Sequence, residues 1–337
     1  MKLARLFPLL ALVVAAGCSG GADKAPDSAV TGKKSDTPTK TLKVALLTPG
    51  PVSDSGWNAL AYNGLQEMKT QLGADVQNQE AEGTKIKDSM RAYAQQNFDL
   101  VIGHGYEYND PAMEVAKDFP KTIFISSSGG KTAANVGAFR FYLEQGFYLA
   151  GMMAADMSKS GKVAMIGGPD VPSIRSTFKA FRAGVLAEKP KDEVIEIFTG
   201  KDSDIAAAKQ ATLQAISQGA DFVIHQANAA AQGVFDAAKE KGIYAFGANA
   251  DQNDNPSGVV IASPVIVAGP AFVDLAKKVQ AGTYKGQITL MGMDIGAIDF
   301  VINPKLKDKI PADVLKKIED TQAKIKTGAL VVPKMEF

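Results

Sequence analysis

Short apolar runs alternate along the chain with longer segments in which apolar residues recur every three or four positions. The first run, LKVALLT, ends at Pro49 and Gly50, as a buried strand does. Further strands are predicted at KTIFISSS, EVIEIFTG, IYAFGA and GVVIAS. Helices are predicted at TKIKDSMRAYAQQN and DIAAAKQATLQAISQG, which end at a polar or glycine stop. This alternation predicts βα units and a parallel sheet.

One such unit occurs twice in the sequence. KVALLTPGPVSDSGWNALAYNGLQEM, from Lys43, is echoed 119 residues later by KVAMIGGPDVPSIRSTFKAFRAGVLA, from Lys162. FDLVIGHGYEYNDPAMEVAKD, around His104, is echoed by ADFVIHQANAAAQGVFDAAKE, whose His225 lies 121 residues further on. Two similar copies at a nearly constant spacing predict an α/β fold of two doubly wound parallel-sheet lobes.

The N-terminal segment has a composition of its own. MKLARLFPLLALVVAAGC combines a basic start with an apolar run too short to span a bilayer as a permanent helix, so residues 1–17 are predicted to be a signal peptide. VAAGC resembles a bacterial lipobox, which implies a lipid on Cys18; the alternative is an ordinary signal peptide followed by a chance cysteine. Residues 18–40 would then be the lipidated cysteine and a flexible, polar tether.

Composition and charge narrow the class of protein. The length of 337 residues suits two domains of common size, and 46% hydrophobic with 22% charged residues is typical of a soluble globular chain. The formal net charge of +1 provides no field to hold a polyanion, so no nucleic-acid partner is expected. Cys18 is the only cysteine, so no intramolecular disulfide can form.

Polar and aromatic side chains gather where the predicted strands end. In doubly wound sheets ligands bind at the carboxyl ends of the strands, and two facing lobes make one shared cleft. The residues expected there are Asp54, Trp57, Asn58, His104, Tyr106, Tyr108, Asp110, Asp170, Arg175, Asp202, Asp204, His225, Gln226, Asn228, Asn249, Asp251 and Gln252. An aromatic plate with carboxylates and amides suits a flat, nitrogen-rich ligand. The alternative for Trp57 is a helix-start residue packed on the core.

Motifs for catalysis, metals and cofactors are absent from the sequence. The two histidines lie in different lobes without metal-ligand spacing and are expected to form hydrogen bonds at strand ends. No G-x-S-x-G elbow lies between a predicted strand and a predicted helix, and no P-loop occurs, so neither an enzyme nor a cofactor is predicted. The pair Asp202 and Asp204 fits a helix N-cap better than an acid/base or calcium site. The basic, amphipathic stretch 305–328 is expected to form a surface helix.

Four motifs carry a resemblance to a known family: DSGWN, IGHGYEYND, LEQGFYLAGMMAADMSKSGKVAMIGG and QGADFVIHQANAAAQGVFDAAKEKGIYAFGANADQ. Over residues 41–300 the chain resembles the basic membrane protein family, substrate-binding lipoproteins of ABC importers that include purine nucleoside receptors. The resemblance implies a type I periplasmic binding protein fold, a purine-like ligand, an ABC permease and its ATPase as partners, and a lipid-anchored place in the cell envelope, facing the periplasm or the exterior.

The resemblance also implies roles for single residues. Trp57 would stack on the base, Asn58 and Asp54 would help to place it, and Asp110 would bind the purine edge. The expected ligand-binding set is Asp54, Trp57, Asn58, Tyr106, Asp110, Asn228, Asn249 and Asp251.

The chain also departs from the family pattern. GKDSDIAAA lacks an expected second aromatic, NAAAQ replaces a glycine-rich segment, GAN replaces GVD, and no lysine lies near Ile266. The missing aromatic affects stacking on the second face of the base, and the other departures affect the contacts to a ribose. The sequence therefore leaves open whether the ligand is a base or a nucleoside.

Three chain crossings are expected between the lobes, near residues 139–142, 247–251 and 282–286. The N-terminal lobe would comprise residues 41–139 plus 249–284, and the C-terminal lobe residues 140–248 plus 285–337. The main hypothesis is a receptor that closes over a purine nucleobase, a nucleoside or a similar heteroaromatic. The alternatives are an extracytoplasmic nucleoside-processing enzyme, or an importer receptor or sensor for another small ligand.

Overall fold

The computed structural model describes residues 40–53 and 56–336, and residues from Thr41 onward form one compact unit. Residues 1–39, which include Cys18, and residue Asp54 lie outside the described part, so the signal peptide, the lipid and the tether stay predictions. Within the described ranges, no helix is both long enough and apolar enough to cross a membrane.

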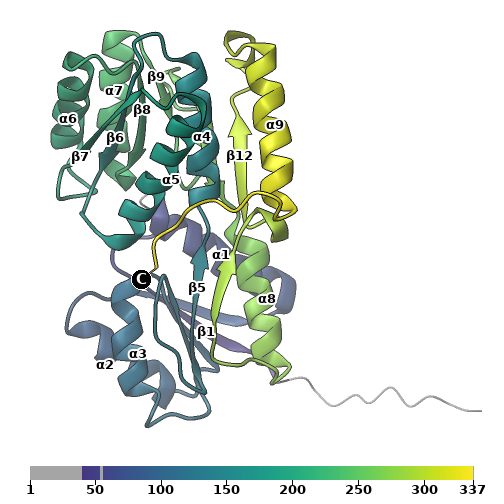
Figure 1. Ribbon diagram of the computed structural model, residues 1–337. Helices are drawn as coiled ribbons and strands as arrows, with labels where there is room; N and C mark the ends of the chain where they lie inside the picture. Colours follow the sequence, from purple (N-terminus) through teal and green to yellow (C-terminus); the bar gives the residue numbers. More distant parts are fainter. Residues whose placement is uncertain (1–39, 54–55, 337) are drawn as a thin grey trace, which may run out of the picture. The chain divides into compact units, whose positions relative to one another are not determined.

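The first sheet has the strand order β11-β5-β4-β3-β1-β2, and all its pairs are parallel. Its strands are β1 (Lys43–Thr48), β2 (Asp75–Glu80), β3 (Leu100–Gly103), β4 (Ile123–Ser127), β5 (Val136–Phe141) and β11 (Ile288–Met291). Helices α1 (Trp57–Leu72), α2 (Lys85–Gln95), α3 (Asn109–Val115) and α8 (Ala268–Gln280) and the short 3-10 turn η1 (Tyr106–Tyr108) cover it, and together they form the first lobe (Figure 1).

Alternating side chains of β1 explain why this sheet is covered on both faces. Val44 and Leu46 point into the core shared with α1 and α8, whereas Ala45 and Leu47 point into the core shared with α2 and α3. Successive residues of a strand face opposite sides, so an unbroken apolar run needs a helix layer on each side.

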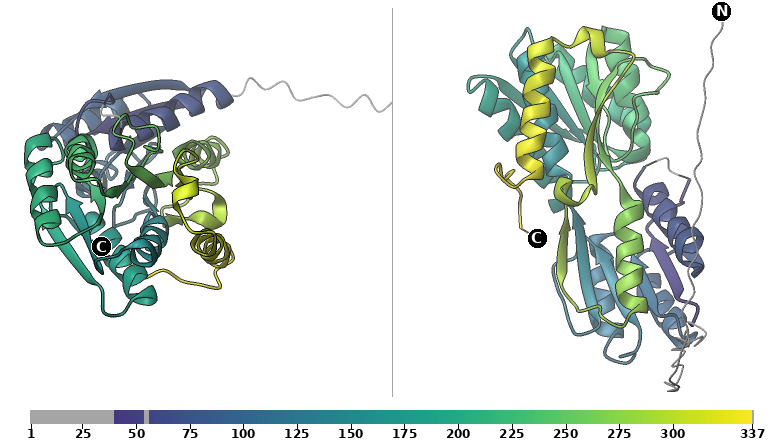
Figure 2. Two further views of the ribbon diagram at one scale, coloured as in Figure 1. Left: turned by 90° about the horizontal axis from the view of Figure 1, so that it is seen from above. Right: turned by 90° about the vertical axis from the view of Figure 1, so that its right-hand side faces the viewer.

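The second sheet repeats this arrangement, with the order β12-β10-β9-β8-β6-β7. Its strands are β6 (Lys162–Gly167), β7 (Glu193–Phe198), β8 (Phe222–Gln226), β9 (Tyr244–Phe246), β10 (Val260–Ile266) and β12 (Ile298–Ile302). The second lobe also contains α4 (Glu144–Met157), α5 (Pro172–Glu188), α6 (Ile205–Ser217), α7 (Ala231–Lys241) and α9 (Ala312–Lys326), with the turns η2 (Asn228–Ala230), η3 (Met293–Ile295) and η4 (Lys307–Lys309). Figure 2 shows α9, drawn in yellow, lying along this lobe.

The two sheets confirm the predicted fold class. In the first sheet β1 lies between β2 and β3, and in the second its sequence echo β6 lies between β7 and β8. The one departure from a parallel arrangement among the described pairs is β12, which runs antiparallel to β10 at the edge of the second sheet. Asp204 accepts a hydrogen bond from the Ala207 N–H at 2.9 Å, so the expected N-cap of α6 is confirmed.

The chain crosses between the sheets at positions that partly differ from expectation. The first crossing follows β5, near residues 139–142, as expected (Figure 1). The second was expected at 247–251, but β10 remains in the second sheet, paired with β9, and the chain crosses only after Ile266.

The third crossing also lies further along the chain than expected. It was predicted at 282–286, but β11 pairs with β5 in the first sheet, so the chain returns to the second sheet between Met291 and Ile298. The segment from residue 249 to the end of β10 was expected in the N-terminal lobe but belongs to the second lobe. The segment from residue 285 to the end of β11 was expected in the C-terminal lobe but belongs to the first lobe. The reason is long-range strand pairing, which local sequence patterns do not encode.

Two glycines let α4 and α5 approach closely. A methyl group on Gly151 would collide with the carbonyl oxygen of Phe181 and lie 3.0 Å from the Val185 nitrogen. A methyl group on Gly184 would likewise collide with the carbonyl oxygen of Tyr148. Because the colliding atoms belong to the backbone, they cannot move without shifting a whole helix.

The substitution Gly151→Ala tests this packing. We expect it to lower the free energy of unfolding by about 1–3 kcal/mol, because the overpacking outweighs the better helix propensity of alanine, worth at most about 1 kcal/mol. Chemical denaturation measures the change. The control is Gln214→Ala on the exposed side of α6, which should be nearly neutral; equal stability of the two variants would contradict the close packing.

Candidate ligand-binding site between the two sheets

A cavity of about 260 Å³ lies where strand ends of the first lobe face strand ends of the second. This is close to the lower limit, about 300 Å³, of typical small-ligand pockets. Its apolar wall includes Trp57, Phe141, Leu143, Val171, Ile174 and Ile266. Its polar groups include Tyr106, Glu107, Arg140, Glu144, Asp202, Gln226, Asn228 and Asn249.

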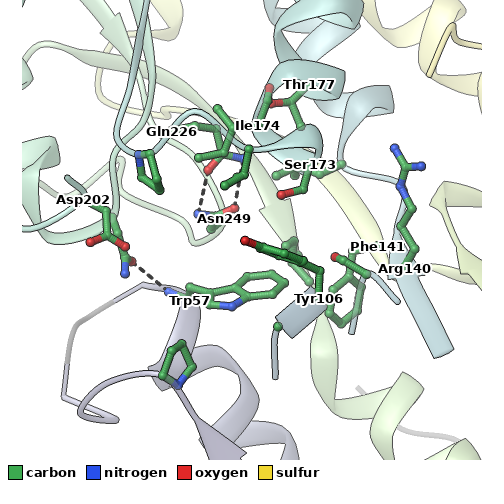
Figure 3. A pocket seen from close by; sticks show the side chains of 18 of the residues that line it. Trp57, Tyr106, Arg140, Phe141, Ser173, Ile174, Thr177, Asp202, Gln226 and Asn249 are labelled. Atoms are coloured by element: carbon green, nitrogen blue, oxygen red, sulfur yellow. Dashed lines mark hydrogen bonds between the residues drawn. The ribbon is translucent and has the colours of Figure 1, made fainter. Parts of the chain in front are cut away.

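Trp57 is held firmly at the start of α1. One face of its indole stacks on the His104 ring, with 3.9 Å between ring centroids and 21° between planes, and its edge meets Phe141. The indole N–H donates to the His104 carbonyl oxygen at 3.3 Å, and His104 Nε2–H donates to the Trp57 carbonyl oxygen at 3.0 Å. Figure 3 shows the indole below the polar side chains of the second lobe. The tryptophan therefore packs on its own lobe and also presents a surface to the cavity.

A pair of amides forms a polar edge of the same cavity. Asn249 Nδ2 donates to Gln226 Oε1 at 3.2 Å, and Gln226 Nε2 donates to Asn249 Oδ1 at 3.4 Å (Figure 3). Tyr106 reaches in from the first lobe and is 52% exposed. A planar edge of donors and acceptors beside an aromatic plate can hold a flat, polar ring.

Asn228 links the two lobes. Its Oδ1 accepts a hydrogen bond from the Trp57 backbone N–H at 3.0 Å. Gly56 precedes α1 and has no side chain to cap it, so Asn228 supplies a cap from the opposite lobe. The residue has a φ of 46°, a left-handed conformation that asparagine tolerates better than most residues.

A buried cluster of charges lies at the first crossing. Arg140, near the end of β5, forms an ion pair with Glu144 in the first turn of α4, and Ser176 Oγ–H donates to Glu144 at 2.5 Å. Arg140 also donates to the Met335 carbonyl oxygen at 2.6 Å, and the Met335 N–H donates to Ser176 Oγ at 2.8 Å. Tyr142 donates to the Val332 carbonyl oxygen. The C-terminal segment thus lies across the crossing and is bound to both sides of it.

The structure brings together four of the eight expected site residues. Trp57, Tyr106, Asn228 and Asn249 line the cavity, and Asn228 does so while bonded to Trp57. The position of Asp54 lies outside the described residues.

Three expected site residues lie elsewhere. Asn58 is buried within the first lobe, because the second residue of α1 points away from the cavity. Asp251 is exposed and accepts from the Asn253 N–H at 3.0 Å. Asp110 lines a neighbouring hollow of about 230 Å³, where its carboxylate is 70% exposed and pairs with Lys131 at 2.7 Å.

Several cavity residues were not among the expected ones. Phe141, Arg140 and Glu144 lie at the end of β5 and the start of α4, and Ile174 lies in the first turn of α5. The charges of FRFYLE within an otherwise apolar stretch were an available signal for the first group. Glu107 lies in η1, a few residues after the end of β3, and the motif that contains it predicted no role for this position.

His225, at the end of β8, has a structural role beneath the site. Its Nε2–H donates to Gln252 Oε1 at 2.8 Å, and the Ala227 N–H points at Nδ1 at 3.4 Å. Burial lowers the pKa of His225 to about 4, although the bond to Gln252 acts in the opposite direction. The neutral ring is therefore the form that the fold accommodates, and the hydrogen bond expected at this strand end is present.

This burial predicts a loss of stability in acid. The folded pKa lies below the unfolded value near 6.5, so the contribution of His225 is complete above about pH 6.5 and is lost as the pH falls toward 4, by up to about 3 kcal/mol. Urea unfolding at pH 7.5 and pH 5 should show wild type more stable than His225→Gln at pH 7.5, with a narrower gap at pH 5. A gap that does not change with pH would show that His225 does not titrate on unfolding.

The bond from Asn228 predicts an effect on lobe closure. Asn228→Gly keeps the backbone conformation but removes the acceptor, so it should shift the population toward open forms by about 0.5–2 kcal/mol. Small-angle X-ray scattering should record a larger radius of gyration. Asn228→Asp, the matched control, retains an acceptor and should remain as compact as wild type; equal expansion of both variants would contradict a role for the acceptor.

Comparisons with known proteins agree with this geometry. A family model described as ABC transporter substrate-binding protein PnrA-like matches residues 41–336. A purine-binding protein of Brucella abortus is 31% identical over 86% of this chain and 82% of its own length. A solute-binding protein of an ABC transporter system from Conexibacter woesei is 25% identical, with a TM-score of 0.71 over 87% of this chain and 99% of its own.

A further solved structure supports the fold alone. A solute-binding protein of an ABC transporter system from Aeropyrum pernix is 20% identical, with a TM-score of 0.78 over 87% of this chain and 94% of its own. The resemblance to the basic membrane protein family is confirmed by the family model, which covers almost all of the described chain. This protein belongs to the family of PnrA-like ABC transporter substrate-binding proteins.

Proposed function

We propose that this substrate-binding protein is a lipid-anchored receptor that captures a purine nucleobase or nucleoside between its lobes and delivers it to an ABC permease. A separate ATPase chain would drive the transport. The lipid would be carried by Cys18 and would hold the protein at the cell envelope, outside the cytoplasm. The receptor would release its ligand chemically unchanged.

The observation that carries the proposal is the setting of Trp57. Its indole is fixed on one side by His104 and lines the cavity, next to the Gln226–Asn249 amide pair. A purine is flat enough to stack on the indole and has ring nitrogens that can pair with amides. The purine-binding relative from Brucella supports the same ligand class.

Each lobe contributes a different part of the proposed site. Trp57 and Tyr106 from the first lobe would hold the ring faces, and Asn249 from the second would bond to the ring edge. Asn228 would position Trp57. Asp110 is proposed at the margin, where it could contact a ligand that extends into the neighbouring hollow, and Asp54 is proposed as a further ligand contact. A ligand held by both lobes favours the closed form, because only that form provides all the contacts.

The alternative function is catalysis, and a direct assay of turnover distinguishes it from binding. Glu107 and Asp202 place carboxylates on opposite walls, so an enzyme acting on a nucleoside is the rival to test. Labelled inosine or adenosine incubated with the full chain should be recovered intact by chromatography. Formation of the free base would overturn the receptor proposal.

Replacement of Trp57 tests the stacking directly. Trp57→Ala should weaken purine binding by about 1–3 kcal/mol, because the stacking plate is removed, and Trp57→Phe should retain most of the affinity. Calorimetric titration measures both variants, and the only tryptophan of the chain makes wild-type fluorescence a second readout.

The fold of each variant is checked by its unfolding midpoint. If Trp57→Ala unfolds near wild type yet binds purines equally well, Trp57 is a core residue and not a ligand contact. If Trp57→Phe binds purines as weakly as Trp57→Ala, stacking on an aromatic ring is not the interaction that binds the ligand.

A further inference from the structure

Glu107 is an acidic residue in the cavity wall with no role yet assigned. It lies in η1, directly after Tyr106, and is partly buried. Among the described residues it forms no ion pair with a lysine or arginine. Glu144, in contrast, is neutralised by Arg140 and bonded to Ser176. Glu107 is therefore a partly desolvated carboxylate in the cavity wall, and no lysine or arginine among the described residues compensates its charge.

The backbone beneath Glu107 is shaped to admit its carboxylate. A methyl group on Gly105 would collide with the Glu107 carboxyl group and lie 2.6 Å from its Oε1. Gly105 also lines the cavity, so the carboxylate lies against the cavity wall and not out in solvent. Burial raises the pKa of Glu107 and the nearby charge of Glu82 adds to this, although a hydrogen bond from the backbone N–H of Glu107 itself acts in the opposite direction. A carboxylate in this setting gains most from hydrogen-bond donors that a ligand brings.

The charge of the wall limits which ligands fit. The lining residues include the three acidic side chains of Glu107, Glu144 and Asp202 against the single guanidinium of Arg140, which is a formal net charge of −2. A phosphate group in this cavity would meet like charges at short range, so a phosphorylated ligand is disfavoured. A neutral or cationic ring that presents N–H groups is favoured for the same reason.

We propose that Glu107 is a specificity-determining residue whose two carboxylate oxygens accept hydrogen bonds from two adjacent N–H donors on the edge of the bound heterocycle. Guanine presents such an edge, with its ring N–H beside its amino group. Adenine and hypoxanthine present one donor beside one acceptor. This inference rests on the proposed function, and it assigns the substrate class as unphosphorylated, donor-rich purines.

The test compares guanosine, adenosine and guanosine monophosphate by calorimetric titration of the full chain. Wild type should bind guanosine most tightly and the monophosphate at least about tenfold more weakly. Glu107→Gln replaces one acceptor by a donor, so guanosine should lose about tenfold or more in affinity while adenosine changes by less than about threefold.

Two further variants make the result specific. Gly105→Ala keeps Glu107 but displaces its carboxylate, so this variant should reproduce the selective loss of guanosine affinity. The backbone of Gly105 has a φ of 165°, an extended conformation that alanine also adopts. Glu82→Gln removes a neighbouring exposed charge that does not line the cavity, so it should change the guanosine affinity by less than about twofold.

The outcomes separate this inference from the function on which it rests. If wild type binds purines but Glu107→Gln and Gly105→Ala weaken guanosine and adenosine equally, or neither ligand, then Glu107 does not determine specificity while the purine receptor stands. Monophosphate binding as tight as guanosine binding would likewise overturn the charge argument. If wild type binds no purine at all, the proposed function fails together with this inference.

Discussion

The buried ion pair of Arg140 and Glu144 is the interaction on which both the lobe arrangement and the cavity depend. Arg140 lies at the first chain crossing and Glu144 directly after it, and both are almost fully buried. Both also line the cavity, and the pair is bonded to Ser176 and to the C-terminal segment at Met335. Removing one partner of such a pair leaves an uncompensated buried charge, typically at a cost of about 3–5 kcal/mol. The pair therefore fixes the wall against which a ligand would rest.

The position of the cavity follows from the duplicated topology. Each sheet ends its parallel strands at one edge, and the crossings set the two edges opposite each other. The first lobe supplies the aromatic surface at Trp57, while the second supplies the amides of Gln226 and Asn249. A bond across the gap, from Trp57 to Asn228, already links the two halves. In the proposed receptor, ligand capture and lobe closure would therefore involve the same residues.

Much of this arrangement could be predicted from the sequence, because local patterns determine local structure. The apolar runs indicated buried parallel strands, the Asp202–Asp204 pair indicated a helix cap, and Trp57 was placed at the cleft from its position after the first strand. Features set by distant pairing could not be predicted: β10 pairs with β9 and so delays the second crossing, and Asp110 pairs with Lys131 outside the main cavity. The role of Glu107 depends on Gly105 beneath it, a contact visible only in three dimensions.

The most direct test of the central claim is thermal unfolding of the full chain in the presence of nucleobases, nucleosides, flavins and sugars. A ligand that binds only the folded state stabilises it, by about 2.7 kcal/mol at a concentration one hundred times its dissociation constant. The account predicts a clear upward shift of the unfolding midpoint with purine bases or their nucleosides and none with sugars. A shift with sugars or flavins and none with any purine would contradict it.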